Sequence, residues 1–151
     1  MKKETQKVTI LIAEDDPDDQ LLCQDALSKS RSDYAIQFVE NGQEVMDYLR
    51  NQGSYESLAA APRPSLIILD LNMPKKDGRQ ALKEIKSDPK LMSIPVVVLT
   101  TSANDLDIKR TYELGVNSYI TKPASFEALV QLMETLTKYW LKTVRLPNGA
   151  S

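Results

Sequence analysis

Three short, almost wholly apolar runs constrain the fold of this chain most strongly: Val8–Ala13, Leu66–Leu69 and Val96–Leu99. Each is too short for a helix and rich in aliphatic residues, which predicts a strand buried on both faces. Two further strands are expected at Ala35–Val39 and Ser118–Thr121. Strands buried on both faces are typical of a parallel sheet that helices cover on each side.

Segments in which apolar residues recur at helical spacing separate these strands. Helices are expected at Pro17–Ser30, Gln43–Asn51, Arg79–Ser87 and Asp105–Leu114, and in a long last helix capped by Ser125. This alternation of strands and helices favours an α/β fold with one doubly wound, parallel, five-stranded sheet. A length of 151 residues fits a single domain of this kind.

The composition excludes several classes of function. The chain has no histidine, which removes serine–histidine triads, histidine-ligated zinc and histidine general bases. Its single cysteine allows no intramolecular disulfide. The net charge of −2 argues against a nucleic-acid surface, and no apolar run reaches the ~20 residues of a membrane span. We therefore expect a cytoplasmic protein without nucleic-acid or membrane partners.

Acidic residues gather where the first strand ends. The run Glu14, Asp15, Asp16, Pro17, Asp18 and Asp19 has five acids in six positions. Asp16 as helix N-cap, with Pro17 at the first helical position, accounts for part of it. Glu14 and Asp15 remain as adjacent carboxylates, which repel each other unless a cation lies between them. From these residues alone, helix capping and a magnesium site explain the run about equally well.

Single polar residues follow three other strands: Asp70 the third, Thr100 the fourth and Lys122 the fifth. Alone, each has an ordinary explanation as a loop cap, a helix start or a solvated lysine. Because the carboxyl ends of parallel strands meet at one edge, we expect them to lie together with the acidic run. Carboxylates, a hydroxyl and an ammonium group suit a site that handles a phosphoryl group, with an aspartate able to act as nucleophile.

These residues, in this order and approximate spacing, resemble the receiver domain of two-component response regulators. The resemblance covers about Val8 to Leu136 and implies a flavodoxin-like (βα)5 fold with strand order 2-1-3-4-5. It implies that Asp70 accepts a phosphoryl group from a separate histidine kinase. It further implies that Mg²⁺ is held by Glu14, Asp15, Asp70 and the backbone carbonyl of Asn72.

The same resemblance assigns roles after the fourth and fifth strands. Thr100 and Lys122 would contact the phosphate oxygens, and Thr100 and Tyr119 would reposition on activation. The peptide bond between Lys122 and Pro123 is expected to be cis by the same analogy. The protein would then be a signalling switch rather than a metabolic enzyme, catalysing only its own phosphorylation and dephosphorylation.

The stretches LDLNMPKKDGRQAL, PVVVLTTS, NSYITKP and YWLKTVRLP are similar to single-domain receivers that partner phytochrome-type histidine kinases. This likeness implies a tail at residues 1–7, a receiver domain at 8–136 and a C-terminal dimerisation arm at 137–151. The arm's apolar residues extend beyond the length needed to cover the sheet, which suggests a partner surface. The expected dimer contacts are Leu136, Trp140, Leu141, Val144 and Leu146.

Other functions fit the residues less well. A flavodoxin-type cofactor site needs a glycine- and hydroxyl-rich loop after the first strand, where this chain has acids. A hydrolase of the haloacid-dehalogenase type needs a second aspartate where Asn72 stands. A DNA-binding regulator needs more than the about fifteen residues that follow the receiver-like part. A receiver-fold binding or dimerisation module that works without phosphorylation remains the main alternative.

Overall fold

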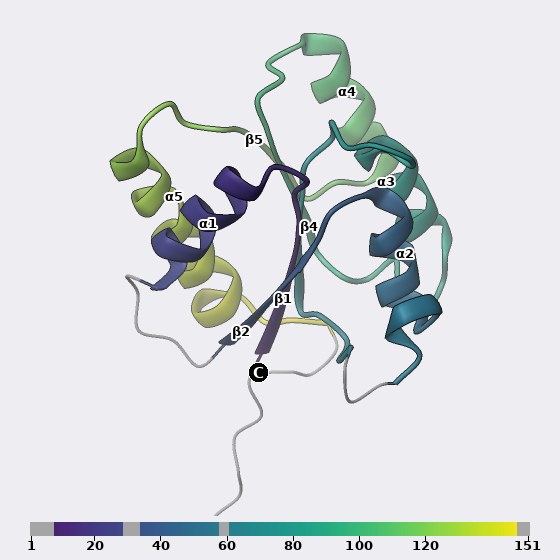
Figure 1. The fold of residues 1–151 in the computed structure, drawn as a ribbon. Coiled ribbons are helices and arrows are strands. Elements are labelled where there is room, and N and C mark those ends of the chain that lie inside the picture. Colours follow the sequence, from purple (N-terminus) through teal and green to yellow (C-terminus); the bar gives the residue numbers. More distant parts are fainter. Residues whose placement is uncertain (1–7, 29–33, 58–60, 148–151) are drawn as a thin grey trace, which may run out of the picture.

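The computed structural model of the chain describes residues 8–28, 34–57 and 61–147. All five expected strands form: β1 (Val8–Ala13), β2 (Tyr34–Val39), β3 (Leu66–Leu69), β4 (Val96–Thr100) and β5 (Ser118–Thr121). They pair in parallel in the order β2-β1-β3-β4-β5. The predicted fold class and strand order are therefore confirmed (Figure 1).

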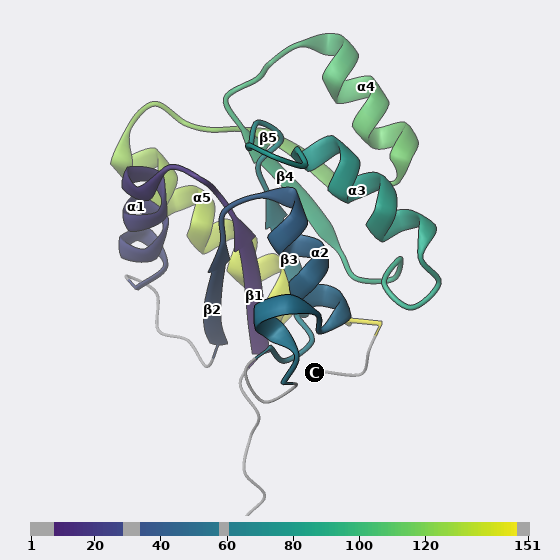
Figure 2. The same ribbon diagram turned by 45° about the vertical axis from the view of Figure 1, so that its right-hand side comes forward.

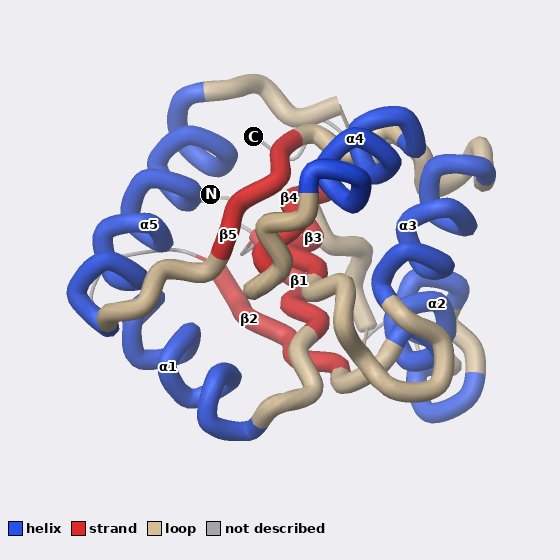
Figure 3. Tube along the Cα trace, turned by 90° about the horizontal axis from the view of Figure 1, so that it is seen from above, coloured by secondary structure: helices blue, strands red, loops and turns tan. Residues whose placement is uncertain are grey.

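Five α-helices connect or follow the strands: α1 (Pro17–Ser28), α2 (Gly42–Arg50), α3 (Gly78–Ser87), α4 (Asp105–Leu114) and α5 (Phe126–Lys138). Figures 2 and 3 show α1 and α5 on one face of the sheet and α2, α3 and α4 on the other. The Ser125 side chain accepts a hydrogen bond from the backbone of Ala128, which confirms it as the cap of α5. In the described parts of the chain, none of the helices is long and apolar enough to cross a membrane.

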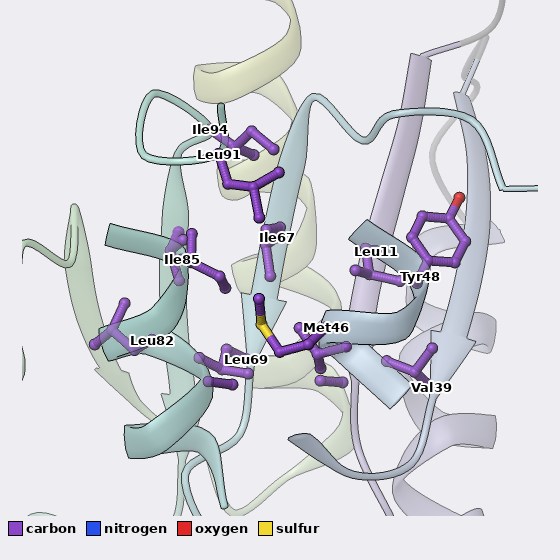
Figure 4. Close-up of a cluster of buried hydrophobic side chains, with 14 of the residues drawn as sticks. Leu11, Val39, Met46, Tyr48, Ile67, Leu69, Leu82, Ile85, Leu91 and Ile94 are labelled. Atoms are coloured by element: carbon purple, nitrogen blue, oxygen red, sulfur yellow. The ribbon is translucent and has the colours of Figure 1, made fainter. Parts of the chain in front are cut away.

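The core consists of two apolar layers, because the strands bury both faces. Alternate residues of β1 illustrate this: Leu11 points to the layer under α2 and α3, and Ile10 to the layer under α1 and α5. Figure 4 shows the first layer, in which Met46 of α2 and Ile85 of α3 lie over the sheet. Cys23 is buried in the second layer, where burial raises the pKa of its thiol to about 11.

The C-terminal extension packs on its own chain, contrary to the expectation that its apolar residues have no core left to cover. After α5 the chain continues as a π-helical turn, Tyr139–Thr143. Trp140 and Leu141 of this turn pack against the second core layer, and Leu146 is only 9% exposed. The extension therefore does have apolar surface of its own chain to cover. The premise that no core remains there was wrong, because the turn after α5 still meets the second core layer; the dimerisation arm itself stays a prediction.

Three predicted segments lie wholly or partly outside the described residues. These are the tail at residues 1–7, the last two residues of the helix expected at Pro17–Ser30, and residues 148–151 of the C-terminal extension.

Candidate functional site

The sheet register brings the chemically distinctive residues to one edge. Ala13 of β1 pairs with Leu69 of β3, and the Asp70 amide donates a hydrogen bond to the Ala13 carbonyl at 3.1 Å. The Lys122 amide donates to the Thr100 carbonyl at 2.7 Å, which aligns the ends of β4 and β5. The acidic run, Asp70 and Lys122 therefore follow the carboxyl ends of β1, β3 and β5, and Thr100 is the last residue of β4. Figure 3 views the sheet from this edge.

Three carboxylates converge at this edge. Glu14, Asp15 and Asp70 each place one oxygen within 4.8 Å of the other two. Glu14 and Asp70 are buried, at 3% and 7% exposure, whereas Asp15 is exposed. Hard oxygen donors in this arrangement, two fixed in the protein and one open to water, fit a divalent metal ion.

The ammonium group of Lys122 lies among the same acids. Its Nζ atom donates to Glu14 Oε1 at 2.5 Å, to Asp19 Oδ2 at 2.9 Å and to Asp70 Oδ2 at 3.4 Å. Burial disfavours the charge on Lys122, but the hydrogen bonds to Glu14 and Asp19 outweigh it and raise the pKa of the lysine. Lys122 therefore stays protonated, and its positive charge partly neutralises the three carboxylates.

Glu14 is the acid that the environment perturbs most clearly. Burial raises its pKa from 4.5 to about 7, although the hydrogen bond from Lys122 opposes the shift. Two further bonds hold the residue: the Asp16 amide donates to its Oε2 atom, and the Gln20 side chain donates to its carbonyl. A metal ion at this site has to compete with protons for Glu14.

A pH dependence follows for the metal-free protein. The folded state keeps the proton of Glu14 up to about pH 7, and we take 4.5 as the ordinary pKa that the unfolded state retains. The folded state therefore binds more protons in this window, so Glu14 makes the free energy of unfolding fall as the pH rises from 4.5 to about 7. Denaturant unfolding in the presence of a chelator measures this, with Glu14→Gln as control. An equal slope in the Gln variant would contradict the assignment.

Thr100 ends β4 with a buried hydroxyl. The residue is 0% exposed, and its Oγ1 atom has no hydrogen-bond partner among the described residues. A buried hydroxyl without a partner costs stability, so its retention needs an explanation. An anion that enters the site and accepts this hydrogen bond would supply one.

Two more predicted residues lie close to this edge. The backbone N–H of Asn72 donates to Asp70 Oδ1 at 3.2 Å and so helps to orient the carboxylate. Tyr119 of β5 is half-buried, and its hydroxyl donates to the Ser102 carbonyl at 2.8 Å, in the loop that follows Thr100. Ligation of a metal by the Asn72 carbonyl stays a prediction.

One sequence prediction about the site is wrong, and one contact was missed. The described residues contain no cis peptide bond, so the bond between Lys122 and Pro123 is trans, the lower-energy isomer before proline. Lys122 reaches Asp70 from this trans arrangement. Asp19, expected only to favour the start of α1, also binds Lys122. The density of acids in the run was the signal that a nearby cation was needed.

Known proteins are similar to this chain in both sequence and fold. The family profile of the response regulator receiver domain matches residues 10–134. The response regulator Rcp1 from Synechocystis sp. is 46% identical over 138 residues, which cover 91% of this chain and 92% of Rcp1.

Two crystal structures are similar over nearly the whole chain. That of the phosphorylated cyanobacterial phytochrome response regulator RcpA superposes with a TM-score of 0.87 at 49% identity, covering 93% of this chain and 99% of RcpA. That of the Mn²⁺-bound form of Rcp1 gives a TM-score of 0.85 at 46% identity, with coverage of 93% and 99%.

The profile match spans most of the chain, and the relatives have nearly the same length. The order of strands agrees with the fold of these proteins, and the acidic cluster lies where a divalent metal can bind. The chain therefore belongs to the response regulator receiver family, whose members are two-component signalling proteins.

Proposed function

We propose that this protein is a stand-alone phosphorylation switch in which Asp70 accepts a phosphoryl group from a phosphohistidine of a separate kinase. A carboxylate oxygen of Asp70 attacks phosphorus, the bond between phosphorus and the kinase imidazole breaks, and the imidazole leaves with the electron pair. The observation that carries the proposal is the contact of Lys122 with Asp70, within a cluster of three carboxylates. The 151 residues of this sequence contain no histidine, so the proposed phosphohistidine donor lies outside them.

The oxygen ligands of the site would bind the metal ion, and its ammonium and hydroxyl groups would bind the phosphate. Glu14, Asp15, Asp70 and the Asn72 carbonyl would hold Mg²⁺, which offsets the negative charge of acceptor and phosphate when bound. Lys122 can leave one of its acids and pair with a phosphate oxygen. The unpartnered hydroxyl of Thr100 can donate to another phosphate oxygen. The same groups would support hydrolysis of the acyl phosphate, which would return the switch to its unphosphorylated state.

Intact mass measurement tests this proposal. Wild-type protein incubated with Mg²⁺ and acetyl phosphate is expected to gain one phosphoryl group, and to gain none when a chelator is present. Asp70→Asn is expected to gain none under either condition, because the amide is a poor nucleophile. A wild type that gains no phosphoryl group would leave a binding module that works without phosphorylation as the better account.

Phosphorylation of Asp70 would change the positions of Thr100 and Tyr119. When Thr100 moves to bond the phosphate, the loop that follows it has to move as well. Tyr119 is bonded to that loop through the Ser102 carbonyl, so its side chain would change position too. Phosphorylation then shifts the population between two arrangements of the surface that α4 and β5 form.

We infer that the donor is a phytochrome-type histidine kinase, as the likeness to the phytochrome response regulator RcpA supports. A small pocket beside the site offers the kinase a docking surface. It is lined by Leu22 of α1, by Lys122 and by Phe126 of α5, among others. Leu22 and Phe126 are 39% and 38% exposed, so apolar surface faces water next to the acceptor. A cytoplasmic location fits this partner.

Phe126→Ser tests the docking surface. We expect transfer from a purified, autophosphorylated phytochrome-type kinase to slow about tenfold, the usual loss for an aromatic contact at an interface. The rate with acetyl phosphate is expected to stay unchanged, because the small donor makes no use of the surface. Met92→Ser, which removes an exposed apolar side chain outside the pocket lining, is the matched control. Equal slowing with both donors would mean that Phe126 supports the site and not the docking.

Residues 137–151 are proposed to form a dimerisation arm, with contacts from Leu136, Trp140, Leu141, Val144 and Leu146. Trp140 and Leu146 are held by their own chain, so Val144 is the most informative position. It is only half-buried and lies outside the core layers.

Sedimentation is expected to show wild-type dimers at high concentration and monomers for Val144→Glu, because a charge there would be buried in the dimer. Thr143→Glu, with the same charge on an exposed neighbour, is expected to remain dimeric. At a concentration low enough for both proteins to be monomeric, the free energy of unfolding of the variant should stay within ~0.5 kcal/mol of wild type. Wild-type protein that sediments as a monomer at high concentration would refute the arm.

A further inference from the structure

A bidentate ion pair between Arg79 and Asp107 joins α3 to α4 beside the site. Arg79 donates from Nε to Asp107 Oδ1 at 2.9 Å and from Nη2 to Asp107 Oδ2 at 2.8 Å. Arg79 is the second residue of α3, and Asp107 lies in the first turn of α4. Their side chains are 35% and 22% exposed. Paired parallel hydrogen bonds fix the relative orientation of the two groups, which a single contact between surface charges does not.

At one end of this ion pair, the backbone beside Arg79 is hydrogen-bonded to Leu71 and closely approaches Asp70. Gly78 directly precedes Arg79, and its amide donates to the Leu71 carbonyl at 2.9 Å. A Cβ atom on Gly78 would lie 2.2 Å from the Asp70 carbonyl oxygen, so the two backbone segments are in direct contact. A displacement of the backbone at Asp70 is therefore passed to the start of α3, where Arg79 is attached.

The other end reaches Tyr119. The Ser102 hydroxyl donates to the same Asp107 Oδ2 atom at 3.0 Å, and the Ser102 carbonyl accepts the hydrogen bond from the Tyr119 hydroxyl. The bonds from Arg79 and Ser102 lower the pKa of Asp107, which keeps the carboxylate charged. Asp107 thus binds both the helix that follows Asp70 and the loop that follows Thr100.

We propose that Arg79 and Asp107 are positioning residues whose ion pair braces the loop after Thr100 in the arrangement in which Tyr119 bonds Ser102. The brace couples the backbone at Asp70 to Tyr119 along a route separate from the Thr100 hydroxyl. Its signalling role rests on the proposed function, but its effect on Tyr119 does not. Breaking the ion pair raises the population of the other arrangement without any phosphoryl group.

Fluorine NMR of protein that carries 3-fluorotyrosine tests the brace in the unphosphorylated state. The Tyr119→Phe variant identifies the Tyr119 resonance by its loss. Arg79→Ala is expected to shift that resonance. Arg50→Ala, which breaks an exposed ion pair between α2 and α3, is expected to leave it in place. A Tyr119 resonance that responds equally to the two variants would overturn the brace.

A double-mutant comparison distinguishes an effect of the ion pair from an effect of generally looser packing. In Asp107→Ala protein, Arg79→Ala is expected to cause no further shift of the Tyr119 resonance, because the contact is already broken. Additive shifts would contradict the proposal. The rate of phosphorylation by acetyl phosphate is expected to change about threefold or more in Arg79→Ala and to stay unchanged in Arg50→Ala. Wild-type protein that takes no phosphoryl group would contradict the proposed function and leave the fluorine result as the test of the brace.

Discussion

Lys122→Met is expected to lower the free energy of unfolding of the metal-free protein by about 3–5 kcal/mol at pH 8. The lysine is 14% exposed and makes hydrogen bonds with Glu14, Asp19 and Asp70. Its removal leaves carboxylates buried without a compensating cation, which costs far more than the loss of a surface ion pair. Denaturant unfolding in the presence of a chelator measures the loss.

Mg²⁺ is expected to reverse part of this loss. A divalent ion at Glu14, Asp15 and Asp70 replaces the missing positive charge, so saturating Mg²⁺ should stabilise the variant more than the wild type. Lys86→Met is the matched control, because Lys86 is a partly buried lysine that donates to the Met92 and Ile94 carbonyls. It should be destabilised without recovery by Mg²⁺. A Lys122 variant as stable as wild type would mean that the acids do not depend on the lysine.

Gly78→Ala is expected to slow phosphorylation at Asp70 at least about tenfold, since displacing the reacting groups by about 1 Å can cost a hundredfold in rate. The added Cβ atom would lie 2.2 Å from the Asp70 carbonyl oxygen and 2.7 Å from the Leu71 Cα atom. Both are backbone atoms, which cannot turn aside as a flexible side chain can. The backbone at Asp70 has to move, and its carboxylate moves with it. The rate of mass gain with acetyl phosphate measures the effect.

The control for Gly78 is a glycine that matters for folding but not for the site. Gly53 has a φ of +57°, and its Cβ atom would approach only the Asp47 side chain, at 3.2 Å. Gly53→Ala is expected to lower stability by about 1 kcal/mol and to leave the rate unchanged. Equal slowing in both variants would show that reduced stability, and not the position of Asp70, limits the reaction.

The three central strands could be predicted because burial on both faces produces short, wholly apolar runs in the sequence, whereas the order of the strands came from the resemblance to receiver domains. Leu66–Leu69 and Val96–Thr100 are apolar up to the residue where each strand ends, and the first polar side chain then marks the edge of the site. One helix start was also predicted correctly, since Ser125 caps α5 with its own side chain. Asp77 and Asn104 cap α3 and α4 in the same way, without having been named as caps from the sequence. Such local interactions depend on neighbours in the sequence.

The contacts that could not be predicted are those between distant side chains. Asp19 and Lys122 are 103 residues apart, and Arg79 and Asp107 are 28 apart. Each pair depends on how two elements are oriented, and nothing in the local pattern encodes that. The packing of Trp140 on its own chain was not predicted for a related reason, because the length of α5 did not reveal where the next turn would pack.

Trapping the acyl phosphate with borohydride tests the central claim most directly. Borohydride reduces an aspartyl phosphate to homoserine, which peptide mass mapping locates in the sequence. After incubation with Mg²⁺ and acetyl phosphate, homoserine is expected at position 70 alone, and omission of Mg²⁺ should abolish it. Homoserine at position 15, or none anywhere in a fully mapped protein, would contradict the assignment of Asp70 as the acceptor.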